Sequence, residues 1–353
     1  MTSSSGPGIS LMTEFAGLAY YAEVPVVVWD IQRIGPSTGL PTRTSQADLT
    51  FVYSIGHGDT QSIILLPGTL DECFEFGWKS FDIAERLQTP VFVLSDLDIG
   101  MNQWMSKPFQ YPDAPMDRGK VLWEKDLEEL KGNWGRYLDK DGDGIPYRTI
   151  PGNKHPTSAY FTRGTGHDEY ARYTEDSDVY MRNMERLKKK FESAKNFMPK
   201  PVLREVKGAD MGIVAFGSTE NAILEAQHLL DKEYGIKSDF LRLRALPFTD
   251  EVTKFIEAHD QIMIVEQNRD GQMYKILLAE YPQYAMKFKS VAFHDGLPAS
   301  ATWVRDGILE KYQKAKSGKQ KAEVKKTAKV VKPKTKSSKE AVTKKKSTAK
   351  KKK

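Results

Sequence analysis

The first hundred residues alternate between two spacings of apolar side chains. Residues 10–22, with Leu11 and Phe15 among the apolar positions, and residues 69–87 show helical spacing, which predicts two helices. Residues 24–31 (VPVVVWDI) and 90–95 (PVFVLS) are continuous apolar runs, typical of strands buried on both faces of a parallel sheet. Because helix and strand alternate, the pattern predicts an α/β fold. The chain opens on a Ser/Gly run, so we expect no strand before the first helix.

A second α/β pattern follows a segment of different character. Residues 101–200 are aromatic, charged and poor in long apolar runs, which predicts an irregular segment that ends in a charged helix over 177–195. The elements predicted after it are strands at 211–216, 239–244 and 261–266 and helices at 219–234, 251–258 and 271–280. From residue 311 the chain is mostly Lys, Ala, Thr, Ser, Val and Pro, a composition that favours disorder.

The net charge of +6 averages two unlike parts. Residues 311–353 hold 19 Lys and two acidic residues, and the remaining 310 residues hold 34 basic against 45 acidic residues. The basic signal therefore belongs to the tail alone, which could contact nucleic acid weakly and non-specifically through its phosphates. No aromatic residue follows Tyr312, so base stacking is not expected there.

Composition excludes several classes of protein. A hydrophobic content of 39% is enough for an ordinary buried core. No apolar run approaches the ~18–20 residues that a membrane span needs, and no signal peptide is recognisable, so we expect a cytoplasmic protein without membrane contact. The single Cys73 excludes an internal disulfide framework and a cysteine-held metal cluster. Residues 139–144 (DKDGDG) resemble the start of a calcium loop, but Ile150 stands where its bidentate glutamate belongs, and we predict no metal site in this chain.

Three segments carry candidate chemistry. The run at residues 2–8 (TSSSGPG) presents backbone N–H groups ahead of a helix, which suits an anion, although a capped loop is the simpler alternative. Residues 33–44 (RIGPSTGLPTRT) follow a strand at its carboxyl end, where ligands of α/β sheets bind, and Arg33 and Arg43 could fork a carboxylate or phosphate. A polar surface loop is the alternative.

The third segment is GHGD at residues 56–59. His57 could bind an anion or move a proton, and a simple turn is an equal alternative. No Ser or Cys nucleophile arrangement accompanies it, which disfavours a hydrolase.

Together these segments resemble a known family. The chain resembles the alpha subunit of the 2-oxoacid:ferredoxin oxidoreductases, particularly the 2-oxoglutarate-type (KorA-like) branch. The motifs that carry the resemblance occur in the order of that family: TSSSGPG followed by LM, DIQRIGPSTGLPTRT, GHGD, CFEF, DGDGIPYRTIPG, YFTRGTGH, YTED and EQNRDGQM. The resemblance covers about residues 2–310, and QRIGPSTG is its most specific element.

The resemblance implies an enzyme that oxidatively decarboxylates a 2-oxoacid to an acyl-CoA and passes the electrons to ferredoxin. Thiamine diphosphate would be shared with a beta subunit that carries Mg²⁺ and the iron–sulfur cluster, and coenzyme A would be the co-substrate. The implied organisation is a partial thiamine-diphosphate pyrimidine-type domain (1–105), an irregular insertion (106–204), a transketolase-C-terminal-like domain (205–310) and a disordered Lys-rich tail (311–353).

The resemblance also implies roles for individual residues. Arg33 is the first candidate for holding the 2-oxoacid carboxylate and Arg43 the second. His57 would reach the distal end of a dicarboxylate, and no residue is assigned the chemical step. The remaining implied contacts are Ser37, Thr38 and Thr42 with substrate, and Ser5, Gly6 and Gly8 with the cofactor.

One departure from the family matters. The YPITP-type substrate motif and the glutamate that contacts the aminopyrimidine, both expected upstream of TSSSGPG, do not occur in this sequence. We therefore expect the first domain to be incomplete and activity to require the missing N-terminal (gamma-like) portion together with the beta subunit. The alternative hypothesis is a non-catalytic binding protein whose Lys-rich tail contacts nucleic acid.

Overall fold

The computed structural model describes residues 1–314. Residues 1–309 form one compact unit. The tail predicted to be disordered lies outside the described residues from 315 on, whereas residues 311–314 continue a helix that begins at residue 301. None of the described helices is both long and apolar enough to cross a bilayer.

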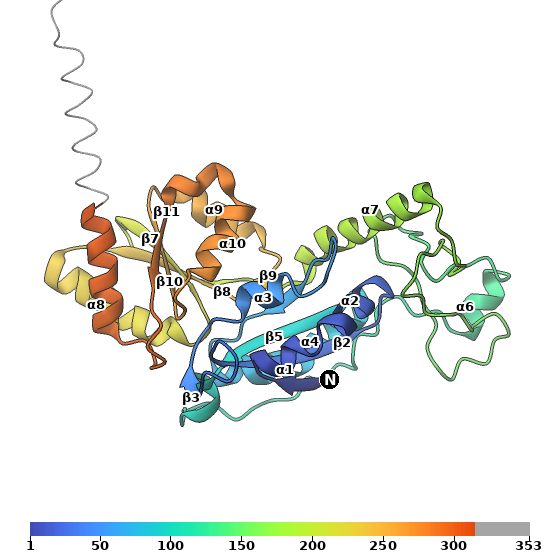
Figure 1. Cartoon of the computed structure of the whole chain (residues 1–353), viewed down its shortest axis with the longest axis horizontal. Coiled ribbons are helices and arrows are strands. Elements are labelled where there is room, and N and C mark those ends of the chain that lie inside the picture. The colour runs from blue at the N-terminus through green and yellow to red at the C-terminus, as the bar shows by residue number, and fades with distance from the viewer. Residues whose placement is uncertain (315–353) are drawn as a thin grey trace, which may run out of the picture. The chain divides into compact units, whose positions relative to one another are not determined.

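The first sheet has six strands in the order β1-β2-β5-β4-β9, with β3 paired to β2 (Figure 1). Strands β1, β2, β5 and β4 run parallel, whereas β3 and β9 join their neighbours antiparallel. The bounds are β1 Thr2–Ser4, β2 Val26–Ile34, β3 Leu40–Thr44, β4 Ile63–Leu65, β5 Pro90–Asp96 and β9 Ala245–Leu246. The two long apolar runs of the sequence are thus adjacent central strands, β2 and β5, as predicted.

One expectation for the first residues is wrong. A strand, β1, precedes the first helix, because three residues without any apolar pattern still pair with β2 through their backbones, Ser4 opposite Asp30. The helix expected over 10–22 is present as α2 (Thr13–Tyr21), and a further short helix, α1 (Gly6–Ser10), precedes it. Leu11 is 85% exposed and Phe15 67% exposed, so these apolar side chains do not pack into the core of this chain.

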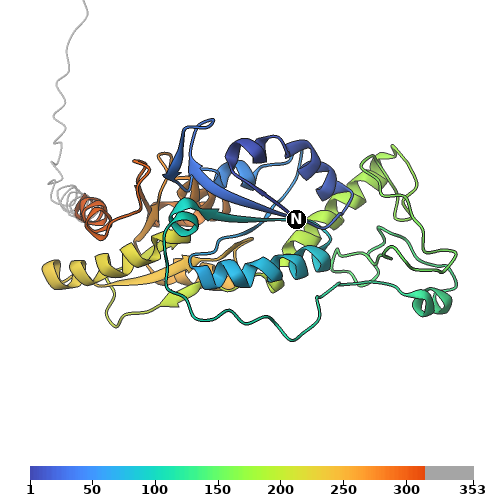
Figure 2. The same cartoon turned by 90° about the horizontal axis from the view of Figure 1, so that it is seen from below.

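Helices cover both faces of the first sheet. Neighbouring residues of β2 face opposite ways: Val28 packs with Ile9 of α1 and Leu49 of α3, whereas Val27 packs with Phe76 of α4. Figure 2 shows α4 on one side of the strands and α1 and α2 on the other. The remaining helix bounds here are α3 Leu49–Tyr53, α4 Leu70–Leu87 and α5 Leu97–Met101.

The predicted helix at 69–87 is confirmed as α4, and its ends have local causes. The Thr69 hydroxyl oxygen accepts the backbone N–H of Glu72, which satisfies one of the free donors of the first turn. Gln88 adopts the left-handed conformation and ends the helix. The buried Phe76, Ala84 and Leu87 form the face that packs on the sheet.

Residues 102–200 contain little regular structure, as predicted. Their helices are α6 (Glu124–Glu129) and the charged helix α7 (Ser177–Ala194), followed by a short 3-10 turn, η1 (Lys195–Phe197). The fully buried Glu23, just after α2, anchors α7 through ion pairs with Arg186 and with Lys190, the latter with Nζ 2.8 Å from Oε2.

The second sheet has five strands in the order β11-β10-β7-β8-β6, all parallel except β6. Its elements are β6 Val202–Arg204, β7 Met211–Phe216, η2 Gly217–Thr219, α8 Glu220–Tyr234, β8 Ser238–Leu243, α9 Asp250–Ala258, β10 Ile262–Glu266, α10 Gln272–Glu280, η3 Pro282–Lys287 and β11 Phe288–Ala292. The six elements predicted in this part are all present, each shifted by one residue or less at either end. The domain boundaries stay predictions, and β9 joins the first sheet although it follows β8 in the chain.

A buried ion-pair network joins α4 of the first sheet to β8 of the second. Arg242 forks the carboxylate of Glu72, with Nη1 2.6 Å from Oε2 and Nη2 2.8 Å from Oε1. Its Nε lies 2.6 Å from Oε2 of Glu220 at the start of α8. Arg244 adds an ion pair to Glu75, one turn further along α4. Since the members are mostly buried, each charge depends on the others for its solvation.

We therefore expect Arg242→Ala to lower the free energy of unfolding by about 1.5–3 kcal/mol, because Glu72 and Glu220 lose their charged hydrogen bonds to Arg242 and keep only Arg244 and Arg204 as ion-pair partners. Urea unfolding followed by circular dichroism measures this loss. The matched control is Lys200→Ala, which removes a cation that is 78% exposed and pairs with Glu251 at the surface. Equal small effects of the two substitutions would contradict the structural role of the network.

Candidate functional site

Residues 33–44 form a β-hairpin at the carboxyl end of β2. Arg33 is opposite Thr44 of β3, and the turn contains a cis Gly35–Pro36 bond and Ser37 with a φ of 55°. Gly39, with a φ of 48°, closes the turn so tightly that a Cβ there would lie 2.1 Å from the Ile34 carbonyl oxygen. The polar residues of the predicted pocket on this hairpin, Ser37, Thr38, Thr42 and Arg43, are exposed.

The Ser5–Gly8 loop lies at the same edge of the sheet, because it follows β1, which runs parallel to β2. The Ser5 carbonyl accepts the N–H groups of Gly8 and Ile9 and begins the short helix α1. A Cβ on Gly6 would lie 2.8 Å from Oδ1 of Asp48, and one on Gly8 would lie 1.8 Å from the Ser4 hydroxyl oxygen. The structure thus brings Ser5, Gly6 and Gly8 to the edge that carries Arg33.

Two buried carboxyl groups lie beneath this loop. Asp30 of β2 is 0% exposed and shares a hydrogen bond with Asp48, which also accepts the Gly6 N–H. Burial, together with the neighbouring Asp48 carboxyl, raises the pKa of Asp30 from 3.8 to about 8, and burial raises the pKa of Asp48 to about 6. Both shifts favour a protonated carboxyl group in this pair at neutral pH.

Arg33 is the cation nearest to this pair. It is half-buried, its guanidinium attracts the Asp48 carboxylate, and its buried Nε finds no hydrogen-bond partner among the described residues. A half-buried guanidinium at this edge can hold a carboxylate or phosphate.

His57 is not brought together with Arg33 in this chain. It lies beside Gly17 of α2 and lines a cavity of about 410 Å³ with Glu14 and Tyr180. The loop that carries it packs near Pro90, where β5 begins, whereas the hairpin follows the carboxyl end of β2. At ~3.3 Å per residue, β2 separates these two edges by roughly 25–30 Å.

A pocket that sequence reasoning missed lies where the carboxyl ends of both sheets meet. Its volume is about 380 Å³, and it is lined by Ile34, Gly35, Pro36, Ser45, Ala47, Asp48, Asn268, Arg269, Asp270, Gln272 and His294. Its second wall comes from the loop after β10, within the EQNRDGQM segment, to which we assigned no role. The rule that placed a ligand site after β2 applies equally to β10 and would have found it.

Buried amides hold the two walls of this pocket together. The Gln46 N–H donates to the Gln267 carbonyl at 2.8 Å, and the Gln267 N–H donates back to Oε1 of Gln46 at 3.0 Å. The Gln46 side-chain amide also donates to the Phe216 carbonyl at the end of β7. The pocket is therefore preformed by hydrogen bonds between the first and second sheets.

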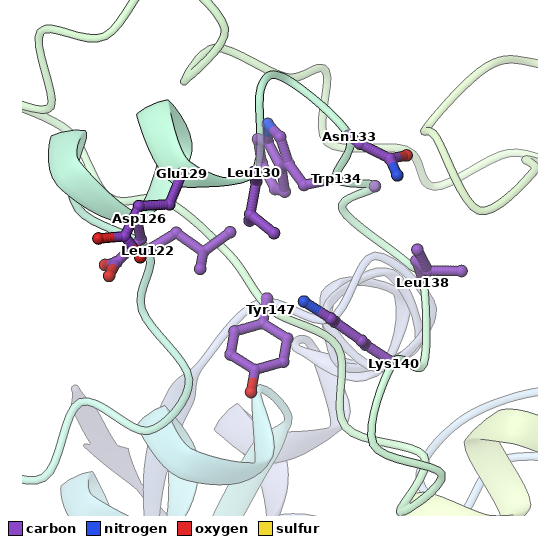
Figure 3. Close-up of a pocket in the computed structure, with 10 residues that line it drawn as sticks. Leu122, Asp126, Glu129, Leu130, Asn133, Trp134, Leu138, Lys140 and Tyr147 are labelled. Atoms are coloured by element: carbon purple, nitrogen blue, oxygen red, sulfur yellow. The ribbon is translucent and has the colours of Figure 1, made fainter.

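A separate pocket of about 240 Å³ lies beside α6 (Figure 3). The side chains of Leu122, Leu130 and Trp134 lie on one side of it and those of Lys140 and Tyr147 on the other. None of the residues predicted to bind substrate or cofactor lines it, so it stands apart from the candidate site.

The acidic turn that resembles a calcium loop has its own partners. Asp139 accepts the backbone N–H groups of Gly142 and Gly144, and the Lys120 ammonium lies 2.7 Å from Asp141 and 2.8 Å from Asp143. Lys120 thus supplies the positive charge within this turn. Across residues 1–314, no group of three or more His, Cys, Asp or Glu side chains is placed to hold a metal ion.

Comparison with known proteins gives a consistent assignment. Residues 1–118 match the family described as pyruvate flavodoxin/ferredoxin oxidoreductase, thiamine diphosphate-binding. The chain is 37% identical over 285 residues to the alpha subunit of 2-oxoacid:ferredoxin oxidoreductase 2 of Aeropyrum pernix, a match covering 79% of this chain and 43% of that one. It is 32% identical over 275 residues to the 2-oxoglutarate synthase subunit KorA of Methanocaldococcus jannaschii, covering 78% of this chain and 70% of KorA.

A solved structure is also similar. The 2-oxoglutarate:ferredoxin oxidoreductase from Magnetococcus marinus, determined with 2-oxoglutarate, coenzyme A and succinyl-CoA bound, superposes with a TM-score of 0.77 at 28% identity. The match covers 88% of this chain and 52% of that one.

These matches therefore define the class of the chain, an α/β subunit of the thiamine-diphosphate-binding oxidoreductases. The chain belongs to the family of 2-oxoacid:ferredoxin oxidoreductase alpha subunits, which confirms the resemblance seen in the sequence. It spans about half the length of several relatives, 43% of the Aeropyrum pernix subunit and 49% of the one from Saccharolobus solfataricus.

The raised pKa of Asp30 makes a prediction for stability. Between pH 3.8 and about 8 the folded chain keeps a proton that the unfolded chain releases, so the contribution of this group to stability falls as the pH rises through that range. Asp30→Asn keeps an N–H donor toward Asp48 without the titration. We expect thermal unfolding midpoints of the variant to depend less on pH over this range than those of the parent chain.

The matched control is Glu23→Gln, because Glu23 is also buried, whereas the Arg186 and Lys190 charges outweigh burial and lower the pKa of Glu23 to about 2, outside this pH range. Parallel pH curves for the parent chain and Asp30→Asn would contradict the shifted pKa.

Proposed function

We propose that the chain is a subunit of a thiamine-diphosphate-dependent oxidoreductase that oxidatively decarboxylates a 2-oxoacid, most favourably 2-oxoglutarate, to the acyl-CoA and passes the electrons to ferredoxin. The observation that carries the proposal is the half-buried Arg33 with a free Nε at the carboxyl edge of β2, beside the Ser5–Gly8 loop. The dicarboxylate is supported by the likeness to KorA and by the 2-oxoglutarate bound in the Magnetococcus marinus enzyme.

Arg33 would bind the substrate carboxylate, because a guanidinium presents two parallel donors that match the two oxygens. Arg43 is the second candidate, and the hydroxyl groups of Ser37, Thr38 and Thr42 on the hairpin would shape the pocket around the bound acid. The role of His57 at the distal end of a dicarboxylate stays a prediction, and the Arg33 site does not depend on it.

The Ser5–Gly8 loop fits contact with thiamine diphosphate. Gly6 and Gly8 leave no room for a side chain, because a Cβ would lie 2.8 Å from Asp48 at Gly6 and 1.8 Å from Ser4 at Gly8. When bound, thiamine diphosphate supplies the carbanion chemistry of decarboxylation. The residues of this chain would then orient the cofactor through loop backbone groups and hold the substrate carboxylate at Arg33.

Other chains would complete the enzyme. We propose that a beta subunit carries the Mg²⁺ and the iron–sulfur cluster, in line with the single cysteine of this chain, and that coenzyme A is the co-substrate. Activity would require the beta subunit and the portion of the family's alpha or gamma chain that bears the aminopyrimidine glutamate. Residues 1–105 would contribute to the pyrimidine-type domain and residues 205–310 would form the transketolase-C-terminal-like domain.

Arg33→Ala tests the site in the assembled complex. We expect the KM for the 2-oxoacid to rise about 10- to 150-fold, because a charged hydrogen bond worth about 1.5–3 kcal/mol is lost. Arg33→Lys, which keeps the charge but not the fork, should lie between the parent and Arg33→Ala. Steady-state kinetics of ferredoxin reduction at varied 2-oxoacid concentration measure both.

Arg86→Ala is the control, because Arg86 pairs with Asp117 at the end of α4, away from the edge site. Unchanged 2-oxoacid kinetics in Arg33→Ala with a raised KM in Arg43→Ala would move the carboxylate site to Arg43. Unchanged kinetics in both variants would refute the proposed site.

A further inference from the structure

The carboxyl pair beneath the Ser5–Gly8 loop is an unusual feature for a strand interior. Asp30 lies in the middle of β2, fully buried, and neither of its oxygens accepts an N–H or a hydroxyl group from any described residue. Its one partner is the Asp48 carboxyl, whose Oδ2 is likewise buried without a donor. Two carboxylates in contact repel, so this arrangement is stable only when a proton lies between them.

Asp48 links this pair to the candidate site through three interactions. It accepts the Gly6 N–H of the loop, it attracts the Arg33 guanidinium, and its own N–H donates to Oε1 of Gln32 at 3.1 Å. It also lines the pocket at the meeting of the two sheets. The protonation of the pair therefore bears on both the loop backbone and the charge around Arg33.

We propose that Asp30 and Asp48 share one proton and act as a positioning pair, which holds the Ser5–Gly8 loop against the sheet and keeps Arg33 in place for an anionic substrate. The inference rests on the proposed function for the identity of that anion, a 2-oxoacid carboxylate. When the shared proton leaves, repulsion moves Asp48 away from Asp30, the Gly6 N–H loses its acceptor, and a second negative charge competes for Arg33.

Few charged residues lie near the Asp30–Asp48 pair. The adjoining β1 and α1 carry no charged side chain, and β5 contributes Asp96, whose carboxyl is held by Ser218. The Arg33 charge acts on Asp48 at longer range than an ion pair, and α5, which also packs on β2, carries Asp98. The charged or titratable residues that share the neighbouring pocket with Asp48 are Arg269, Asp270 and His294.

The shared proton can be observed in the full chain without any activity. In D₂O, infrared difference spectra at neutral pH should show the carbonyl stretch of a protonated carboxylic acid, and this band should lose intensity as the pH is raised past about 8. Asp30→Asn should remove this pH-dependent loss. Glu23→Gln is the matched control and should leave it unchanged: Glu23 is also buried, but the Arg186 and Lys190 charges outweigh burial and lower the pKa of Glu23 to about 2.

Absence of the band from the parent chain at neutral pH would overturn the shared proton, and so would persistence of its pH-dependent loss in Asp30→Asn. Removal of that loss by Glu23→Gln instead would assign the proton to another carboxyl group and overturn the pair equally.

The positioning role is tested by the pH profile of the assembled complex. If only the protonated pair binds the substrate well, the KM for the 2-oxoacid should rise about tenfold between pH 7 and 9, with kcat changing less. Asp30→Asn should abolish this alkaline rise, and Asp30→Glu, which restores a titrating carboxyl, should bring it back. A merely structural role would leave the pH profile of the variant parallel to that of the parent.

The two ideas fail in different ways. A complex without any 2-oxoacid-dependent activity refutes the proposed function, whereas the infrared band still decides whether the proton is shared. An active complex whose alkaline KM profile is the same in parent and Asp30→Asn refutes the positioning role and leaves the proposed function intact.

Discussion

The fork between Glu72 and Arg242 is the interaction on which the rest of the structure depends. It joins the helix that covers the first sheet to a central strand of the second, and Glu220 and Arg244 extend it. Burying these charges costs several kcal/mol each, so the network is stable only as a complete set with its geometry kept. With this link in place, the hydrogen bonds between Gln46 and Gln267 can hold the carboxyl edges of the two sheets together.

That closure has consequences for chemistry. The hairpin that carries Arg33, the Ser5–Gly8 loop and the loop after β10 all follow strands at the same kind of edge, where parallel sheets bind ligands. The Asp30–Asp48 pair beneath them couples proton binding to the local charge, since one proton more or less changes the balance around a single guanidinium. The site is thus built from backbone and charge together, which suits an enzyme whose cofactor carries out the bond-breaking steps.

Much of this could be predicted from the sequence. Continuous apolar runs identified β2, β5 and β7, helical spacing identified α4, and the position of Arg33 directly after a strand placed it at a ligand-binding edge. The specific motifs identified the family. Each of these signals lies within a short stretch of the chain, so a single sequence is enough to detect it.

The features that could not be predicted from the sequence are those that arise only from tertiary contacts. Strand β1 has no apolar pattern and exists because β2 offers it a partner, and Leu11 and Phe15 keep helical spacing without facing the core. The position of His57 at the opposite edge depends on how its loop returns beside α2. The carboxyl pair had one sequence signal that could have been used, a lone Asp near the end of the apolar run VPVVVWDI, but its partner Asp48 is 18 residues away.

The most direct test of the account is to purify the tagged chain from its own cells with its bound partners and to measure ferredoxin reduction. The assay compares 2-oxoglutarate, pyruvate and no 2-oxoacid, each with and without coenzyme A. The account predicts reduction that requires both coenzyme A and a 2-oxoacid and that is fastest with 2-oxoglutarate. A preparation that contains a beta subunit yet reduces ferredoxin with none of these acids would contradict it.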